Sequence, residues 1–195
     1  MAAAIGVGLI LVLAGPRGSS LTLILAGIAV SAFAAALTSL ALNLSPNPYA
    51  ASEIMFWMMG SVANRALSHV WLALPIMALG WAALAGLGRG LDALTLGEDA
   101  AEAMGISLSR LRLQLLFGTA AAVGAATAVA GAVGFVGLVV PHILRRFAEG
   151  RPSTLLWASA IGGAAMVLAA DLATRLVLPE RDLKLGVVMA LIGAP

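Results

Sequence analysis

The chain contains no cysteine among its 195 residues. A sequence without cysteine forms no disulfide framework, carries no thiolate nucleophile and offers no sulfur ligands to a zinc ion. Thiol redox catalysis is therefore excluded, whereas the compartment of the protein is left open. Histidine is almost as scarce, because only His69 and His142 occur, and both are isolated in the sequence. We expect no metal site and no cofactor.

Charged residues are the second scarce class. Only 10% of the chain is charged while 62% is hydrophobic, and the mean hydropathy is +1.05. Soluble domains carry roughly a quarter charged residues, so the solvent of this chain must be lipid. The net charge of +2 reflects scattered arginines rather than a basic stripe, which excludes nucleic acid as a partner.

Catalytic motifs are missing as well. The sequence has no glycine-rich dinucleotide fingerprint after a strand, no Walker lysine motif and no HExxH zinc motif. The hydrophobic segments also lack paired carboxylates and histidine clusters. We therefore predict that the protein is not an enzyme and that nucleotide hydrolysis takes place on a separate subunit.

Long apolar segments dominate what remains. About 20 apolar residues cross the hydrocarbon core of a bilayer as one helix, so several crossings are expected and the fold class is an all-α polytopic membrane protein. Turn-forming residues at 15–20 and 43–52 separate the first segments. We predict spanning helices at 21–42, 70–88 and 152–178, a short interfacial helix at 53–62, and a further helix from Leu185.

The apolar segment 113–143 is too long for one crossing. A helix of these 31 residues would measure about 46 Å, whereas the hydrocarbon core is about 30 Å thick. We predict one helix up to Ala130 and a second from about 135 to 147. The break falls at a glycine cluster that also permits close packing and is expected to line a pathway, since unpaired backbone is costly in lipid. The cluster consists of Gly131, Gly134 and Gly137.

Basic residues are distributed unevenly between alternate loops. Short cytoplasmic loops are enriched in Lys and Arg, so the richer side is expected to be cytoplasmic. The richer side collects Arg17, Arg89, Arg110, Arg112, Arg145, Arg146 and Arg151, and the other side has Arg65, Arg175, Arg181 and Lys184.

The stretch 96–113 concentrates charge in a chain that otherwise avoids it. Three acids near a helix start suit the helix dipole, and Gly105 is expected to split the stretch into two short helices. One interpretation is an ordinary solvated linker. The other is a docking helix, because small exposed side chains permit close approach of another protein. The acids are Glu98, Asp99 and Glu102, and the small residues are Ala100, Ala101 and Ala103.

Several ordered blocks resemble one transporter family. They are GEDAAEAMGISLSRLRL (97–113), AGAVGFVGLVVPHILRR (130–146), LAADLATRL (168–176), GVVMALIGAP (186–195), LILAGIAVSAFAAALTSL (23–40) and FWMMGSV (56–62). The sequence resembles permease subunits of ABC importers for iron-siderophores, haem and cobalamin, with Lys184 and Met189 as departures from the usual proline and threonine. The resemblance implies a partial ten-helix permease, with residues 1–195 a single transmembrane domain incomplete at both ends.

The resemblance also implies partners and site residues. A cytoplasmic coupling loop at about 90–112 would form two short helices that sit in a groove of an ABC ATPase subunit. The coupling residues would be Gly97, Glu98, Asp99, Ala100, Ala101, Glu102, Met104, Gly105 and Arg110. Two interpretations of Arg110 and Arg112 stay open, which are pairing with acids of the ATPase or with lipid phosphates, and a role as ordinary cytoplasmic anchors. The other implied partners are a second permease subunit, expected to be an identical chain, a periplasmic substrate-binding protein and the bacterial inner membrane.

The outer end of the predicted spanning helix 152–178 carries a further candidate site. Asp171 and Arg175 are spaced i, i+4, which predicts a mutual ion pair. The resemblance implies that Arg175 meets a glutamate of the binding protein, and Arg181 is expected to add to the same positive rim.

Two other function classes compete with an ABC importer. A secondary transporter for a small solute needs an ionisable residue deep in a span, and none lies at mid-helix. A membrane enzyme or a structural scaffold is the other class, and the enzyme lacks catalytic clusters. Because the spans offer no set of charges for a bare ion, we expect a large chelated cargo that moves by alternating access.

Overall fold

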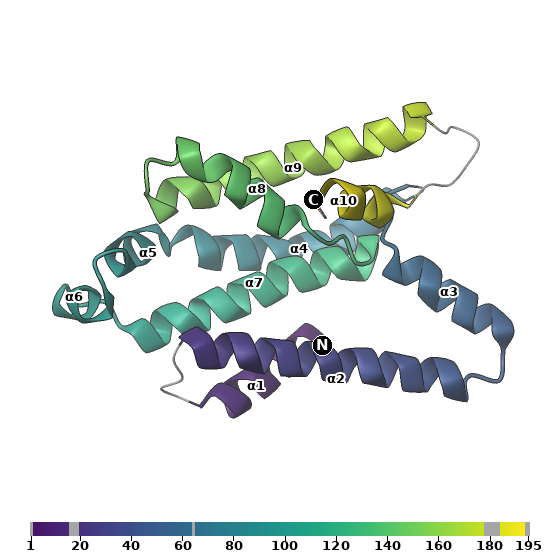
Figure 1. Cartoon of the computed structure of the whole chain (residues 1–195), viewed down its shortest axis with the longest axis horizontal. Coiled ribbons are helices and arrows are strands. Elements are labelled where there is room, and N and C mark those ends of the chain that lie inside the picture. Colours follow the sequence, from purple (N-terminus) through teal and green to yellow (C-terminus); the bar gives the residue numbers. More distant parts are fainter. Residues whose placement is uncertain (1, 16–19, 64, 178–183, 194–195) are drawn as a thin grey trace.

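The computed structural model describes residues 2–15, 20–63, 65–177 and 184–193, and these residues form helices joined by turns, without a strand. The long helices lie side by side, so that their ends meet at two opposite ends of the molecule (Figure 1). Within these described ranges, four helices are long and apolar enough to cross a membrane, which confirms the predicted multi-pass architecture. They are α2 (Ser20–Leu44), α4 (Leu67–Ala85), α7 (Leu108–Ala130) and α9 (Pro152–Val177).

Helices α4 and α7 form the most extensive helix pair of the bundle. Gly80 of α4 lies against the backbone of α7, where an added Cβ would stand 2.7 Å from both the Gly118 carbonyl oxygen and the Ala122 nitrogen. Small residues at such a contact let two helix backbones approach closely. In lipid the pair is then held by van der Waals packing, because no hydrophobic driving force acts between the helices. Helices α1 (Ala2–Ala14) and α6 (Glu98–Ala103) also contact α7 of this pair.

The N-terminal helices pack at one side of this pair. Helix α1 (Ala2–Ala14) contacts α2 and α7. Helix α3 (Pro48–Met58) begins where the Asn47 side chain accepts a hydrogen bond from the Tyr49 N–H at 3.0 Å. Proline suits the first helical position because its missing N–H has no intrahelical acceptor there. The sequence prediction of a helix at 53–62 is therefore wrong in its bounds, since the cap starts the helix earlier.

The predicted break after Ala130 is confirmed. Helix α8 (Val136–Leu144) follows after a short non-helical segment and continues into the 3₁₀ turn η1 (Arg145–Phe147). With nine residues, α8 is only about 14 Å long, less than a bilayer crossing. The segment between α7 and α8 therefore returns into the bundle before α8 begins (Figure 1).

The last described helix, α10 (Leu185–Gly193), packs against α8 and α9. Its Met189 is fully buried and forms a small core with Ala170 of α9 and Leu185. The methionine at this departure from the family pattern is therefore a packing residue of the helix interface.

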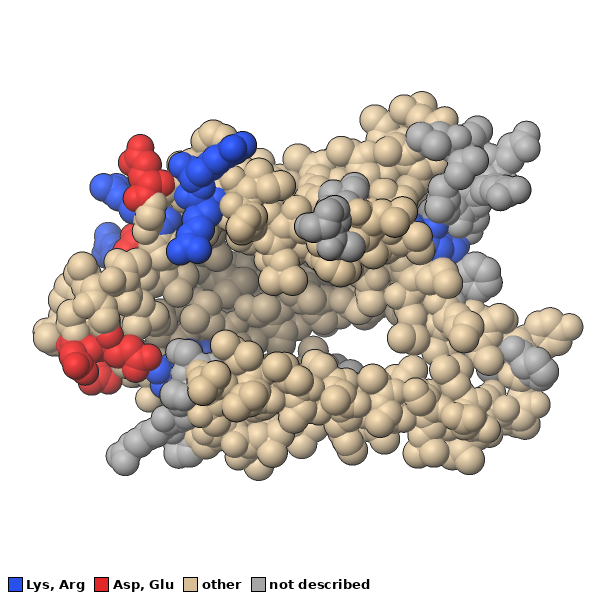
Figure 2. Space-filling model, in the orientation of Figure 1, with Lys and Arg blue, Asp and Glu red and all other residues tan. Residues whose placement is uncertain are grey.

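The two ends of the bundle differ in charge. One end carries the short helices α5 (Gly88–Leu94) and α6 (Glu98–Ala103), and we name it the α6 end. The opposite end, reached by α3, is named the α3 end. Figure 2 shows acidic and basic side chains gathered at the α6 end, whereas few appear on this view of the α3 end.

Candidate functional site

The charged stretch 96–113 divides at Gly105, as the sequence predicted, but the part after Gly105 is the start of the spanning helix α7, and the second short helix, α5, precedes the stretch. Helices α5 and α6 are separated by Thr95–Gly97, whereas Gly105 lies between α6 and the spanning helix α7. Both glycines adopt positive φ, +104° for Gly97 and +84° for Gly105, a region that favours glycine. Each glycine therefore allows the chain to change direction, and α6 lies between these two turns.

A small core holds α5, α6 and the start of α7 together. Ala101 is 0% exposed and packs with Ala93 of α5 and Leu108 of α7, and Ile106 packs against the same cluster. The expectation that Ala101 lies on an exposed docking face is therefore wrong, because the neighbouring short helix covers it. Among the other predicted alanines, Ala103 is exposed.

The turns on either side of α6 expose large apolar side chains outside the candidate spans. Leu96 is 70% exposed and Met104 is 54% exposed. Exposed apolar side chains bordered by polar ones are typical of protein interaction sites. We define the α6 surface as the exposed residues Leu96, Asp99, Glu102, Ala103 and Met104. The sequence analysis missed Leu96, although a leucine in a polar loop was a signal for it.

The remaining predicted coupling residues surround this surface. Gly97, Gly105 and Arg110 are exposed, and Ala100 is half-buried. Glu98 forms an ion pair with Arg112 of α7, with 2.7 Å between Glu98 Oε1 and the guanidinium Nη2. Arg112 therefore has a carboxylate partner within the chain, and its pairing with acids of the ATPase or with lipid phosphates stays a prediction. The pair fastens the start of α6 to α7.

A second link joins the short helices to α9. The Asp92 carboxylate of α5 accepts a hydrogen bond from the Ser153 N–H at 2.9 Å and another from the Ser153 hydroxyl at 2.6 Å. These bonds, helped by the nearby Arg151 charge and opposed by desolvation, lower the pKa of Asp92. Because the pKa is depressed, the carboxylate stays charged at neutral pH, and the link weakens only as acidification protonates it. Sequence reasoning missed this residue.

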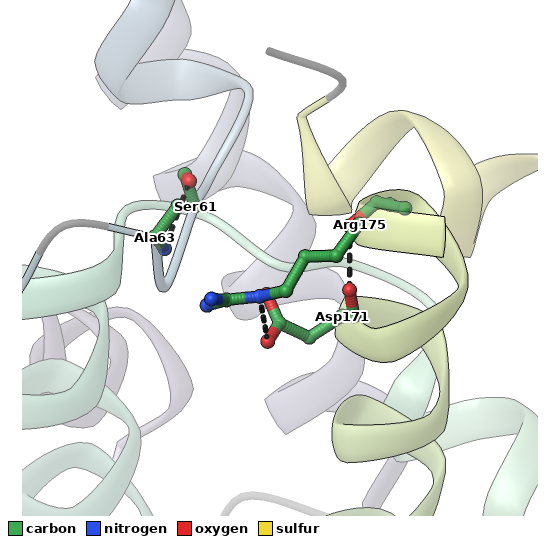
Figure 3. Close-up of polar contacts among 5 residues, drawn as sticks. Ser61, Ala63, Asp171 and Arg175 are labelled. Atoms are coloured by element: carbon green, nitrogen blue, oxygen red, sulfur yellow. Dashed lines mark hydrogen bonds and ion pairs between the residues drawn. The ribbon is translucent and has the colours of Figure 1, made fainter. Parts of the chain in front are cut away.

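At the α3 end, the predicted ion pair on α9 is confirmed. Arg175 Nε lies 2.9 Å from Asp171 Oδ2, and the arginine side chain is 60% exposed while that of Asp171 is 19% exposed. Figure 3 shows the Arg175 side chain extending past Asp171 toward the loop that carries Ser61 and Ala63. Arg181 lies outside the described residues.

The three predicted glycines of the break differ in their roles. Gly131 has φ +75° and ψ −173°, a conformation reached essentially only by glycine. A Cβ at Gly131 would collide with the Trp57 carbonyl oxygen, whereas nothing lies within 4 Å of a Cβ added at Gly134 or Gly137. Gly131 is therefore the residue that the break requires.

A cavity of about 1010 Å³ opens beside the break. Helices α1, α3, α4 and α7 supply its walls, which are mainly apolar and include Trp57, Phe117 and Gly131, with Glu53 as an acidic member. Within the described ranges no group of three or more His, Cys, Asp or Glu side chains is placed to hold a metal ion. The cavity therefore suits an apolar or large neutral occupant better than a bare ion.

Comparison with known proteins gives consistent matches. The chain is 38% identical over 174 residues to the uncharacterized ABC transporter permease protein YvrB of Bacillus subtilis (strain 168), covering 89% of this chain and 49% of that protein. It is 38% identical over 180 residues to the vitamin B12 import system permease protein BtuC of Vibrio cholerae, covering 92% and 54%. It is also 38% identical over 173 residues to the Fe(3+) dicitrate transport system permease protein FecC of Escherichia coli (strain K12), covering 89% and 52%.

A solved structure agrees with these relatives. It is described as an inward-facing conformation of an ABC transporter assigned to the metal-chelate type, and it matches with a TM-score of 0.84 and 30% sequence identity over 97% of this chain and 60% of that one. The chain spans about half the length of the curated relatives it matches. Because the model of the FecCD transport family matches residues 1–195, the chain belongs to the FecCD transport family.

Proposed function

We propose that the chain forms part of a permease subunit of an ATP-driven importer for chelates of the iron-siderophore, haem or cobalamin type. Membership of the FecCD transport family supports the transport role, and relatives named for vitamin B12 and ferric dicitrate support the class of cargo. The permease itself would make no covalent change to the cargo. ATP hydrolysis would take place on a separate ABC ATPase subunit.

The α6 surface is the observation that carries this proposal. It places exposed Leu96 and Met104 beside exposed acids at an end of the bundle outside the candidate spans. A folded protrusion of this kind suits a groove on a soluble partner, because apolar side chains there gain from burial. We propose that the partner is the ATPase and that the α6 end faces the cytoplasm of a bacterial inner membrane.

The opposite end would receive a periplasmic substrate-binding protein. Arg175 is mostly exposed although it is paired with Asp171, so a carboxylate of the partner has access to its remaining donors. Arg181 would add to the same positive rim. A second permease subunit, identical to the first, would complete the transporter.

The translocation path would run along the cavity beside Gly131. Irregular backbone at the depth of a bilayer is tolerated where it is covered by protein or lines a cavity, and Gly131 is itself one of the cavity-lining residues. Gly134 and Gly137 would contribute small surfaces to the same path. The opening would alternate between the two sides as the ATPases close and separate.

Affinity capture of the ATPase tests the proposal. The full-length permease is purified in mild detergent from cells that express its ATPase, and the ratio of the two subunits is measured. We expect Met104→Arg, in which a charge replaces an exposed apolar contact, to lower ATPase recovery at least tenfold, equivalent to about 1.4 kcal/mol or more. Tyr49→Arg is the matched control, because Tyr49 is 82% exposed at the α3 end, and it should leave recovery unchanged.

Recovery of the ATPase at the original ratio with Met104→Arg would contradict the coupling role of the α6 surface. Equal loss in both variants would instead indicate a general folding defect, and the proposed function would then be tested by the uptake measurement alone. Uptake of radiolabelled cyanocobalamin, haem and ferric siderophores by the complete transporter identifies the cargo.

A further inference from the structure

We propose that Asp92 is a positioning residue that makes α5 and α9 move as one body, so that a displacement of the short helices reaches the opposite end of the bundle. This inference rests on the proposed transport function and deepens it. It assigns a residue that lies outside the α6 surface and touches neither the proposed ATPase contact nor the cavity.

The Asp92–Ser153 link joins residues that are 61 positions apart in the sequence. Ser153 is the second residue of α9, and N–H groups in the first turn of a helix have no intrahelical acceptor. The Asp92 carboxylate supplies that acceptor from a different helix and also accepts the Ser153 hydroxyl hydrogen. Hydrogen bonds to an ionised acceptor are roughly twice as strong as neutral ones.

Helix α5 lies tightly between two spanning helices. A Cβ added at Gly88 would stand 3.1 Å from the Ser153 Cβ of α9, and one added at Gly90 would stand 2.5 Å from Leu111 Cδ1 of α7. Gly88 therefore allows α5 to approach α9 closely, whereas Gly90 borders the end of the flexible Leu111 side chain. With this packing, α5 cannot slide along α9 while the Asp92–Ser153 link is intact.

Helix α9 extends the effect across the molecule. Its 26 residues correspond to about 39 Å of continuous helix, with Ser153 near one end and Arg175 near the other. Proline occurs in α9 only at its first position, so the helix has no proline kink. A shift imposed on α5 is therefore transmitted to the end that carries the Asp171–Arg175 pair.

The alternative is that Asp92 merely stabilises the first turn of α9. Three variants separate these roles in the complete transporter reconstituted in liposomes with its ATPase and binding protein. Asp92→Ala removes the link. Asp92→Ala combined with Ser153→Asp gives α9 an anion in its own first turn, which restores the favourable charge at the helix N-terminus without the link.

The third variant restores the connection between α5 and α9 without an anion at the start of α9. Asp92→Ala combined with Gly88→Cys and Ser153→Cys places two cysteines in positions whose Cβ atoms are close to the spacing of about 3.5–4.5 Å that a disulfide requires. The 195 residues contain no cysteine that would compete. Oxidation and reduction then form and break the connection reversibly.

The readout is uptake of labelled cyanocobalamin and ferric dicitrate per ATP hydrolysed, together with ATPase recovery. We expect Asp92→Ala to lower uptake per ATP about tenfold while the ATPase still co-purifies, because the variant loses two hydrogen bonds to a charged carboxylate. The variant with Ser153→Asp should stay at the low level. The cysteine variant should recover uptake when oxidised and lose it when reduced.

Unchanged uptake per ATP with Asp92→Ala would overturn the inference. So would full recovery by Ser153→Asp, or failure of the oxidised cysteine pair to restore uptake. Failure of the proposed function itself has a different signature, because the unsubstituted permease would then neither recover an ATPase nor take up any of the probes.

Discussion

Gly131 lies at a junction of backbone segments that requires a glycine. Around it three separate segments meet through backbone atoms, because the Ser61 N–H donates to the Ala130 carbonyl oxygen at 2.7 Å and the Gly186 N–H donates to the Met59 carbonyl oxygen at 3.0 Å. Added Cβ atoms at Gly131 and Gly186 would collide with backbone oxygens. Glycine at these positions therefore allows α3, the break after α7 and the start of α10 to share one junction.

We predict that Gly131→Ala destabilises the protein by roughly 2–6 kcal/mol. A conformation reserved for glycine costs about 1–3 kcal/mol for another residue, and crowding against backbone costs a further 1–3 kcal/mol. The thermal midpoint of the detergent-purified, full-length permease measures the effect.

Gly134→Ala is the matched control for this prediction. It lies in the same break, its φ is not positive, and nothing stands within 4 Å of the added methyl group. Its midpoint should stay within a degree or two of the original. Equal midpoints for the two variants would mean that the junction does not depend on Gly131.

At the scale of elements, α5 and α6 form a folded unit rather than a flexible connection. Ala101 at its centre leaves no space for a larger side chain, whereas Ala103 on the same helix is exposed. We predict that Ala101→Leu opens the unit, because overpacking a small core costs about 1–3 kcal/mol. Amide hydrogen exchange of the segment 93–108 in the purified permease should accelerate about tenfold or more.

Ala103→Leu provides the comparison, since the two alanines lie on one short helix and receive the same change. Exchange in the segment should remain slow in this variant, while ATPase recovery should fall because the added bulk stands on the α6 surface. Fast exchange in both variants, or in neither, would be inconsistent with a core centred on Ala101.

Much of the order of the helices could be predicted, because helices that cross lipid require long uncharged runs in the sequence. Uncharged runs of about 20 residues indicate crossings, and the length of 113–143 required a break that the glycines located. The early start of α3 was missed because the Asn47 cap with Pro48 was interpreted as a turn. This capping pattern is local, so the sequence did contain the signal.

The candidate site was less predictable because its key contacts are long-range. Helical periodicity assigned Ala101 to a face but did not indicate that α5 covers that face. Asp92 carries no local motif, and its partner Ser153 is remote in sequence. Which of three glycines adopts the unusual conformation also depends on backbone from other helices, as at Gly131 with Trp57.

At the scale of the whole molecule, the unequal share of basic residues at the two ends predicts how the protein is oriented in the membrane. Basic residues favour the cytoplasmic side, and the α6 end carries the larger share of them. We predict that the full-length Glu102→Cys variant resists a membrane-impermeant maleimide in intact spheroplasts and reacts after permeabilisation. Tyr49→Cys, at the exposed α3 end, should react in intact spheroplasts.

Mass spectrometry of the labelled permease gives the result, with the unsubstituted chain as background. Labelling of Glu102→Cys before permeabilisation would place the α6 end outside the cell and would remove the coupling proposal together with the proposed docking at Arg175.

The acids of the α6 surface have a consequence for assembly kinetics. Asp99 and Glu102 are exposed, so their attraction to a basic partner is screened beyond about 10 Å at 0.1 M ionic strength. Rising salt would therefore slow the encounter between subunits. Burial of Leu96 and Met104 does not depend on screening, so the lifetime of the assembled complex would change little. Osmotic shifts in the cell would then alter how quickly transporters form, but not how long they last.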